Sequence, residues 1–365
     1  MIEKFKIDIP REKVSKIKEK VKNYPWNLIP NLPDWKHGTN LPYLKEICDY
    51  WIKDFNWSLY EKKINNFQNF KTHVDGINIH FIKEEGSGSN PKNLLLIHGW
   101  PGSVIEFIKI INQLAHPENY GGNKEDGVTV IAPSLPGFGF SESPNEPYGP
   151  RKIAEILNKM MTINLKYKNY VAQGGDWGAT IANWLGYDHD KYCKAIHINC
   201  LTMRHPDGPQ TDKEKKWQEK FDKDQIMQDG YRTQQATKPQ TLSYAMMDSP
   251  VGIAAWIIEK MHGWSDLKDG NIESVYSKDV LLANIMTYLC TDTFSTSTWI
   301  YFGRREEGGR LFPKEMSEWP PRSYVERIFN IQQWTEMKSG GHFASLEKPD
   351  LLVDDILNFF KKIKI

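Results

Sequence analysis

The chain has 365 residues, and its 47 Lys and Arg against 46 Asp and Glu give a net charge of +1 at pH 7. A balance this even argues against nucleic acid or a strongly charged surface as a partner. The length allows one large domain or a core domain with an inserted second one.

Cysteine spacing and hydropathy narrow the class of protein further. The four cysteines lie far apart without CxxC or CxxH spacing, so we expect buried free thiols rather than a disulfide scaffold or a zinc site. No stretch is apolar for long enough to form a signal peptide (~7–15 residues) or a membrane-spanning helix (~20 residues). These features predict a cytoplasmic protein without a membrane anchor or a metal. The 13 Trp, 16 Tyr and 16 Phe suit a large core or an apolar ligand pocket.

The first part of the chain contains two helices followed by a hairpin. Apolar residues recur at helical spacing in residues 11–24 and 41–55, and prolines separate the two segments. Two short alternating runs, "FKTHV" and "INIHFIKEE", are joined by Asp75-Gly76, which favours a tight hairpin. A turn-rich linker then leads into "LLLIHG", a continuous apolar run typical of a buried parallel strand.

The middle of the chain alternates between strands and helices. Helices are expected at 103–115, 150–164 and 178–187, and strands at "VTVIAP", "NYVAQ" and "KAIHIN". Such alternation predicts a parallel sheet with helices on both faces. Residues 201–300 are helix-prone and interrupt the alternation, as an inserted lid does. The chain ends with a predicted strand at 332–337, "QQWTEM", the turn "SGGHF" and an amphipathic helix at 349–362.

The stretch "NYVAQGGDWGAT" has the pattern of a nucleophile elbow, with a strand before the glycines and a helix after them. In such an elbow a sharp turn exposes the central side chain, here Asp176, and small neighbours allow the turn to pack. An aspartate between glycines is a weak signal by itself, because such residues are usually found in ordinary turns. Two distant segments strengthen the prediction that Asp176 is a nucleophile.

The first of these segments is "HGWPGS", which directly follows the strand "LLLI". In a hydrolase with an elbow, this loop donates a backbone N–H to an oxyanion site, and the residue after the nucleophile donates another. The expected donors are therefore the amides of Trp100 and Trp177. We expect His98 to be a structural residue of the loop.

The second segment is "SGGHFASLEKP", which follows the last predicted strand and contains His342. Hydrolases of this kind place their general base there. An aspartate that attacks an sp³ carbon forms an ester whose carbonyl belongs to the enzyme, and a histidine can then activate water against that carbonyl. The pair Asp176 and His342 therefore suits an epoxide or a carbon–halogen bond.

The chain resembles the epoxide hydrolases of the microsomal type over nearly its whole length. The resemblance rests on the motifs "HGWPGS", "SLPGFGFS", "GGDWGA", "DSPVGIAAWIIEK" and "SGGHFASLEKPDLL". It implies Asp176 as nucleophile, His342 as base, and Glu315 in "LFPKEM" as the acid that orients the histidine. It also implies two lid tyrosines that bind the epoxide oxygen, Tyr231 in "DGYRTQQATKP" and Tyr301 in "STWIYFG". Ring opening creates an alkoxide, to which a neutral phenol can donate a proton.

The sequence departs from the family pattern between Tyr301 and Glu315. In the family a strand precedes the acid, but "YFGRREEGGRLFPKE" contains no β-rich run, so one core strand is expected to be missing. Asn199 follows the strand "AIHI", where some relatives carry the acid, but it has no charge. The other acidic residues between the lid and His342 are Glu306, Glu307, Glu318, Glu326 and Glu336. The first two lie in a charged run, Glu326 lies in a helix-like segment and Glu336 lies in the predicted last strand, so these fit the role less well.

These observations predict an α/β-hydrolase fold with a helical lid and an N-terminal meander. Its parts are the meander with the first antiparallel strands (1–92), the first part of the core (93–200), the lid (201–300) and the C-terminal part of the core (301–365). The expected activity is hydrolysis of a small apolar epoxide by water, without metal or cofactor. Two alternatives are a haloalkane dehalogenase and a catalytically impaired relative that binds apolar ligands. The sequence leaves a homodimer open.

Overall fold

The computed structural model describes residues 1–226, 228–307 and 319–363, and it contains one mixed sheet of seven strands. Their order across the sheet is β1-β2-β3-β5-β4-β6-β7, with antiparallel pairing from β1 to β5 and parallel pairing from β5 to β7. The strands are β1 Ile2–Lys4, β2 Gln68–Val74, β3 Ile77–Glu84, β4 Asn93–Ile97, β5 Thr129–Pro133, β6 Tyr170–Gly174 and β7 Cys193–Ile198. The predicted α/β-hydrolase fold is confirmed.

The predicted hairpin joins β2 to β3. Val74 pairs with Ile77, so the turn consists of Asp75 and Gly76 alone. Both residues have positive φ, 49° and 85°, which a two-residue turn of the type that suits twisted strands requires. Aspartate and glycine tolerate this conformation, which is why the dipeptide predicts the hairpin.

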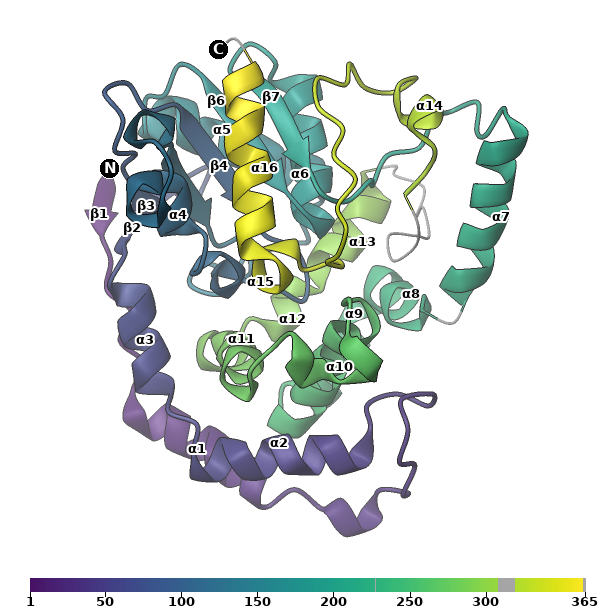
Figure 1. Cartoon of the computed structure of the whole chain (residues 1–365). Helices are drawn as coiled ribbons and strands as arrows, with labels where there is room; N and C mark the ends of the chain where they lie inside the picture. Colours follow the sequence, from purple (N-terminus) through teal and green to yellow (C-terminus); the bar gives the residue numbers. More distant parts are fainter. Residues whose placement is uncertain (227, 308–318, 364–365) are drawn as a thin grey trace.

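Helices cover both faces of the parallel part of the sheet (Figure 1). Helices α4 and α16 lie on one face, and α5 and α6 lie on the other. Their bounds are α4 Ile111–Ala115, α5 Pro150–Lys159, α6 Asp176–Asp188 and α16 Pro349–Lys362. Because both faces are covered, β4 is apolar on both sides, and its residues from Leu94 to Ile97 have no exposed surface.

The single helix predicted at 103–115 is wrong. The structure has a short 3-10 helix, Val104–Phe107, followed by the separate α4. On one continuous helix the buried side chains of this segment would lie on several faces, rather than on the single apolar face of an amphipathic helix. They are Val104, Ile105, Phe107, Ile110 and Ile111.

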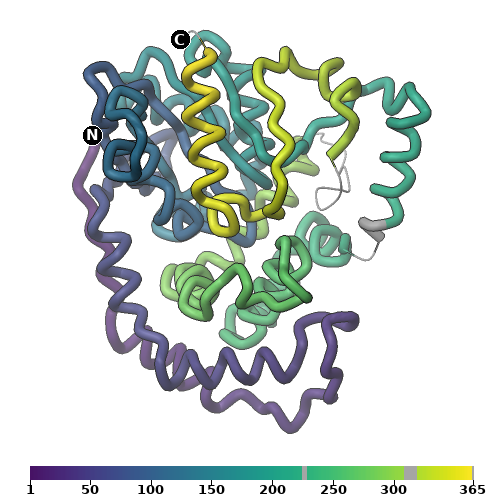
Figure 2. The backbone as a smooth tube through the Cα atoms, viewed as in Figure 1, coloured from purple at the N-terminus to yellow at the C-terminus, as the bar shows by residue number. Residues whose placement is uncertain are grey.

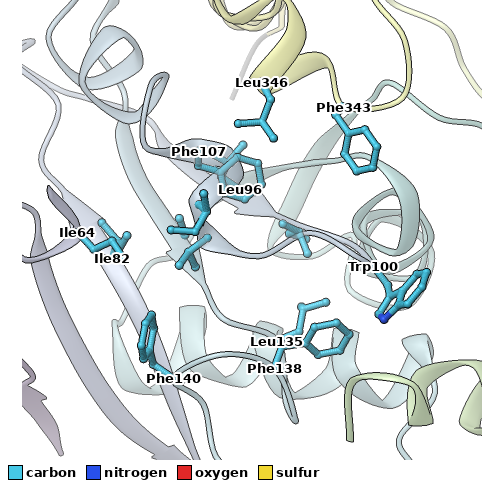
Figure 3. Close-up of a cluster of buried hydrophobic side chains, with 14 of the residues drawn as sticks. Ile64, Ile82, Leu96, Trp100, Phe107, Leu135, Phe138, Phe140, Phe343 and Leu346 are labelled. Atoms are coloured by element: carbon cyan, nitrogen blue, oxygen red, sulfur yellow. The ribbon is translucent and has the colours of Figure 1, made fainter. Parts of the chain in front are cut away.

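The hydrophobic core continues from the sheet into the loops that surround its strand ends. Figure 3 shows Leu96 of β4 and Phe107 near Leu346, a residue from the C-terminal part of the chain that belongs to the same cluster. Trp100 and Phe343 of the same cluster lie in the two loops in which the sequence predicts an oxyanion donor and a base. The core therefore holds both loops against the sheet.

The N-terminal helices and most of the lid helices form a second layer beyond the strand ends, whereas the lid helix Asp212–Ile226 lies beside the sheet (Figures 1 and 2). The lid helices are α7 Asp212–Ile226, α8 Gly230–Thr237, α9 Pro239–Met246, α10 Pro250–Gly263, α11 Lys278–Thr291, α12 Phe294–Ser297 and α13 Trp299–Glu306. The N-terminal helices are α1 Arg11–Lys22, α2 Leu41–Lys53 and α3 Trp57–Asn65. All three pack against α11, so the meander supports the lid from outside.

The strand predicted at 332–337 is wrong. Residues 331–337 are irregular, and β7 forms the edge of the sheet, since no further strand follows it in residues 199–226, 228–307 and 319–363. A groove of about 1280 Å³ separates this segment from β7. Side chains hold it to α16 instead, because Gln333 and Thr335 donate hydrogen bonds to Asp355 at 2.8 and 2.6 Å.

The remaining C-terminal elements are short. They are α14 Arg322–Val325 and α15 Ala344–Glu347, and α15 leads into the long helix α16, which matches the predicted helix at 349–362. The predicted loss of a strand before the acid stays a prediction. The segment that would contain that strand and Glu315 includes residues outside the described part of the chain.

Candidate active site

Asp176 sits in a tight turn between β6 and α6, with φ of 49°. A Cβ on Gly174 would lie 2.2 Å from the carbonyl carbon of Gly178, and a Cβ on Gly178 would lie 2.0 Å from the carbonyl oxygen of Ile97. Neither contact is tolerable, so the turn needs glycine on both sides of the aspartate. The motif "GGDWG" therefore forms the predicted elbow.

The carboxylate of Asp176 is held on one side by the loop after β4. Its Oδ1 accepts a hydrogen bond from the Trp100 amide at 2.7 Å. Gly99 is needed beside it, because a Cβ there would lie 2.2 Å from Oδ1. The Trp177 amide belongs to the first turn of α6, where backbone N–H groups have no intrahelical acceptor. The structure therefore shows one of the two predicted donors, the Trp100 amide, at the carboxylate, and the role of the Trp177 amide stays a prediction.

His342 lies on the other side of the same carboxylate. Its Nε2 is 3.4 Å from Asp176 Oδ2, and both side chains are almost fully buried. The His342 amide donates to the Trp264 carbonyl of the lid at 3.0 Å, and the imidazole packs edge-on against the Trp264 ring at 5.2 Å. The structure therefore brings together the two residues that the sequence places 166 positions apart, at 176 and 342.

The loop that carries His342 is organised by Glu347, a residue that the sequence analysis missed. Glu347 Oε2 accepts from the amides of Gly341 at 2.8 Å and Asp266 at 2.9 Å, and its Oε1 accepts from the Phe343 amide at 2.9 Å. One buried carboxylate thus ties the histidine loop to the lid. An acidic residue between buried Leu346 and the start of α16 is the sequence signal that could have indicated this role.

The two predicted tyrosines meet above Asp176 in an aromatic cluster with the two tryptophans. Tyr231 of α8 stacks on Trp100 at 5.3 Å, and Tyr301 of α13 packs edge-on against Trp177 at 4.8 Å. The tyrosine rings lie 5.8 Å apart. The lid therefore brings two phenols to the elbow, where an apolar substrate would contact aromatic faces.

Tyr301 is poised to donate a hydrogen bond. Its side chain is 1% exposed, and its hydroxyl has no hydrogen-bond partner among the described residues. Burial raises the pKa of Tyr301 well above its ordinary value, with smaller contributions from Tyr231 and the Asp176 charge. The phenol thus stays neutral, and a buried hydroxyl without a partner favours a ligand oxygen beside it.

His98 has a structural role, as the sequence indicated. Its Nε2 accepts a hydrogen bond from the Leu135 amide at 3.2 Å, and its Nδ1 lies 3.0 Å from the Gly99 carbonyl. Burial lowers the pKa of His98 to about 4, so the ring is neutral at pH 7. A neutral ring with both nitrogens engaged by backbone fixes the oxyanion loop.

Glu315, the acid predicted to orient the histidine, lies outside the described residues. The weaker candidate Glu318 lies outside them as well. Glu307 is exposed and accepts from the amides at the start of α5. Glu326 forms an exposed ion pair with Arg322 at 2.6 Å, and Glu336 is exposed in the segment that is not a strand.

The described part of the chain also bears on metal binding, membrane spans and cysteines. Within residues 1–226, 228–307 and 319–363, no group of three or more His, Cys, Asp or Glu side chains is arranged to hold a metal ion. In the same ranges, no helix combines the length and the apolar character that crossing a membrane requires. Cys48, Cys193 and Cys290 are buried free thiols, as predicted, and Cys200 is buried too.

Comparisons with known proteins identify the family of this chain. Residues 2–107 match the family model for the epoxide hydrolase N terminus, and residues 92–246 match that for the alpha/beta hydrolase fold. Epoxide hydrolase 1 of Sus scrofa is 33% identical over 98% of this chain and 88% of its own length. Juvenile hormone epoxide hydrolase 1 of Ctenocephalides felis is 33% identical over 100% of this chain and 86% of its own length. The crystal structure of juvenile hormone epoxide hydrolase from the silkworm Bombyx mori superposes with a TM-score of 0.87 at 27% identity, covering 99% of this chain and 94% of that one.

Proposed function

The chain belongs to the epoxide hydrolases of the α/β-hydrolase superfamily, and we propose that Asp176, His342, Tyr231 and Tyr301 carry out its reaction. The observation that supports this assignment most directly is that the two carboxylate oxygens of Asp176 have different neighbours. Asp176 Oδ1 is held by the Trp100 amide, whereas Oδ2 faces His342. One oxygen is thus placed to remain a carbonyl and the other to attack.

In the first step Asp176 Oδ2 attacks a carbon of the epoxide, and the C–O bond to the ring oxygen breaks. The ring oxygen takes a proton from Tyr231 or Tyr301, which are the phenols above the elbow. A neutral phenol suits this role because it donates to an oxygen that becomes negative only as the bond breaks. The product of this step is an alkyl-enzyme ester.

In the second step His342 takes a proton from water, and the water oxygen attacks Cγ of Asp176. The charge that develops on Oδ1 remains beside the amides of Trp100 and Trp177. The Cγ–Oδ2 bond then breaks, and the imidazolium protonates the departing diol oxygen. The second proton of the water returns to the tyrosinate through solvent, so the enzyme is regenerated.

The aromatic cluster supports an apolar epoxide as the substrate class. Trp100, Trp177 and the two tyrosines present ring faces to the elbow, and these favour apolar surface. Because the chain belongs to the epoxide hydrolases, the alternative prediction of a haloalkane dehalogenase is not supported. The predicted cytoplasmic location and a homodimer stay predictions.

The test combines two substrates with one substitution. The purified protein is incubated with styrene oxide and with a bromoalkane, and diol and bromide are measured. We expect diol but no bromide, and Asp176→Ala should abolish both diol formation and any mass adduct with epoxide. Asp190→Ala, an exposed aspartate beyond the far end of α6, is the matched control. Turnover by Asp176→Ala near the wild-type rate would contradict the assignment, and no turnover by the wild type would support the impaired relative.

A further inference from the structure

A small cavity lies behind the elbow, on the side of Asp176 that faces His342. Its volume of about 10 Å³ is close to the space that one water molecule needs. The polar side chains at its wall are Glu106, Gln173, Asp176, Asn199, His342 and Ser345. It is therefore a polar site of the right size beside both residues of the second step.

Gln173 shows independently that this cavity needs an occupant. The side chain is 2% exposed, and its Nε2 donates to Asn199 Oδ1 at 3.0 Å. Its Oε1 has no hydrogen-bond partner among the described residues. A buried amide oxygen without a partner is destabilising, and one water in the cavity would satisfy it.

Glu106 is the second carboxyl at the cavity, and the proposed reaction has not used it. It belongs to the 3-10 helix Val104–Phe107 and lies against the loop that carries the Trp100 amide. A Cβ on Gly102 would come within 1.5 Å of Glu106 Oε1, so only glycine leaves room for this carboxyl. The side chain is partly buried and borders the cavity.

From this geometry we propose that the cavity holds the hydrolytic water, and that Glu106 positions this water for His342 in the second step. The inference rests on the proposed function, because it assigns a role in hydrolysis of the ester on Asp176. Glu106 Oε1 or Oε2 accepts one proton of the water as a hydrogen bond, while His342 takes the other proton. Gln173 Oε1 orients the water from the opposite wall.

The charges around Glu106 connect its ionisation to the state of Asp176. The pKa of Glu106 is raised to about 8, chiefly by burial; His342 lowers it, the Asp176 charge raises it, and a hydrogen bond from the Gly99 backbone lowers it. Tyr276 and Tyr288 also face Glu106, and both are neutral phenols because burial raises their pKa values. When Asp176 becomes an ester its charge disappears, and when His342 becomes an imidazolium its attraction grows. Both changes favour the Glu106 carboxylate during hydrolysis.

The test separates the two half-reactions in the full chain, with styrene oxide as the probe. Single-turnover mixing followed by intact mass measures formation of the ester and its decay. For Glu106→Gln we expect ester formation within about twofold of wild type and decay about 10- to 100-fold slower, so ester accumulates. Glu106→Asp, which keeps the charge, should recover part of the decay rate. Glu12→Gln, an exposed glutamate of α1, is the matched control.

The pH profile supplies a readout that a structural role would not change. The decay rate of wild-type ester should rise as Glu106 ionises, and this limb should be absent in Glu106→Gln. If that variant does not fold, Gln173→Leu tests the same water from the other wall and should also slow decay alone. Decay at the wild-type rate, or equal slowing of both steps, would overturn the inference. Absence of any ester in the wild type would instead contradict the proposed function.

Discussion

The two halves of the active site are held in place by different means. Asp176 is fixed by the sheet, since β6, the neighbouring Ile97 carbonyl and two glycines leave its turn one conformation. His342 is fixed by side chains and by the lid, since Glu347 ties its loop to Asp266 and its own amide bonds to Trp264. No described strand delivers the histidine to the site. The nucleophile thus depends on local backbone geometry, whereas the base depends on how the lid docks.

Because of this difference, substitutions in the two regions should affect different steps of the reaction. A change in the lid near Trp264 or Asp266 should displace the base and leave the nucleophile in place. In the proposed mechanism the first half-reaction needs Asp176 and the tyrosines, and the second needs His342. Changes in the histidine loop should therefore leave ester formation intact and slow its hydrolysis.

Replacing the base should give the largest effect. His342→Gln is expected to consume about one equivalent of epoxide and then stall, because alkylation needs no base while hydrolysis does. Steady-state diol formation should fall about 10³- to 10⁴-fold. Intact mass after mixing would show the adduct. A folded variant that forms no adduct would contradict the division between the two regions.

Removing the phenols should affect the first half-reaction instead. Tyr231→Phe or Tyr301→Phe alone should slow ring opening about 10-fold, because the remaining phenol still donates to the same oxygen. The double change should slow it about 100- to 1000-fold, which corresponds to the ~2.7–4 kcal/mol of an oxyanion-hole donor. Ester decay should change little. Stopped-flow mixing with epoxide measures both steps. Equal rates in the double and single variants would show that the phenols do not share one oxygen.

The same tyrosines predict a pH limit. The pKa of Tyr301 is raised, so its neutral form persists at pH values where an ordinary tyrosine, with a pKa of about 10, would ionise. Ring opening should therefore not decline through Tyr301 below about pH 10. A decline near pH 9 that disappears in Tyr301→Phe would contradict this expectation.

Much of the sheet-held region could be predicted from the sequence, because its determinants are local. The elbow follows from glycines next to Asp176, and the hairpin follows from Asp75-Gly76, where backbone conformation selects the residues. The Trp100 amide could be predicted as well, since the loop after β4 has a fixed place in the fold. These predictions needed no knowledge of distant contacts.

The rest depends on contacts between distant segments. Residues 332–337 have the composition of a strand, but a strand forms only beside a partner, and here side chains hold the segment to α16. Glu347 gains its role from Asp266, 81 residues earlier in the chain. Glu106 gains its role from a cavity whose wall includes Gln173 and His342. Periodicity and motifs do not contain this information.

Weakening the histidine loop should give an intermediate effect. Glu347→Gln keeps the size of the side chain but loses the charge that accepts three backbone N–H groups. We expect a loss of about 1–3 kcal/mol in the free energy of unfolding and ester decay about 10-fold slower, because His342 is no longer held at Asp176. Ester formation should stay near wild type. Glu326→Gln, in an exposed ion pair, is the control and should change stability by less than about 1 kcal/mol.

The smallest effect is expected for Glu315, the acid that the family resemblance implies. A histidine base needs a carboxylate at its far nitrogen to hold the tautomer and stabilise the imidazolium, and loss of such a carboxylate in a serine protease triad costs ~10⁴-fold. Here the sheet ends at β7, so the strand that would deliver this acid is missing from the described residues. Glu347 and the lid already fix the loop of His342. Glu315→Gln should therefore lower turnover much less than ~10⁴-fold, as measured by diol formation at saturating styrene oxide. A loss near that size would show that Glu315 still reaches His342, and that the histidine side is as firmly built as the nucleophile side.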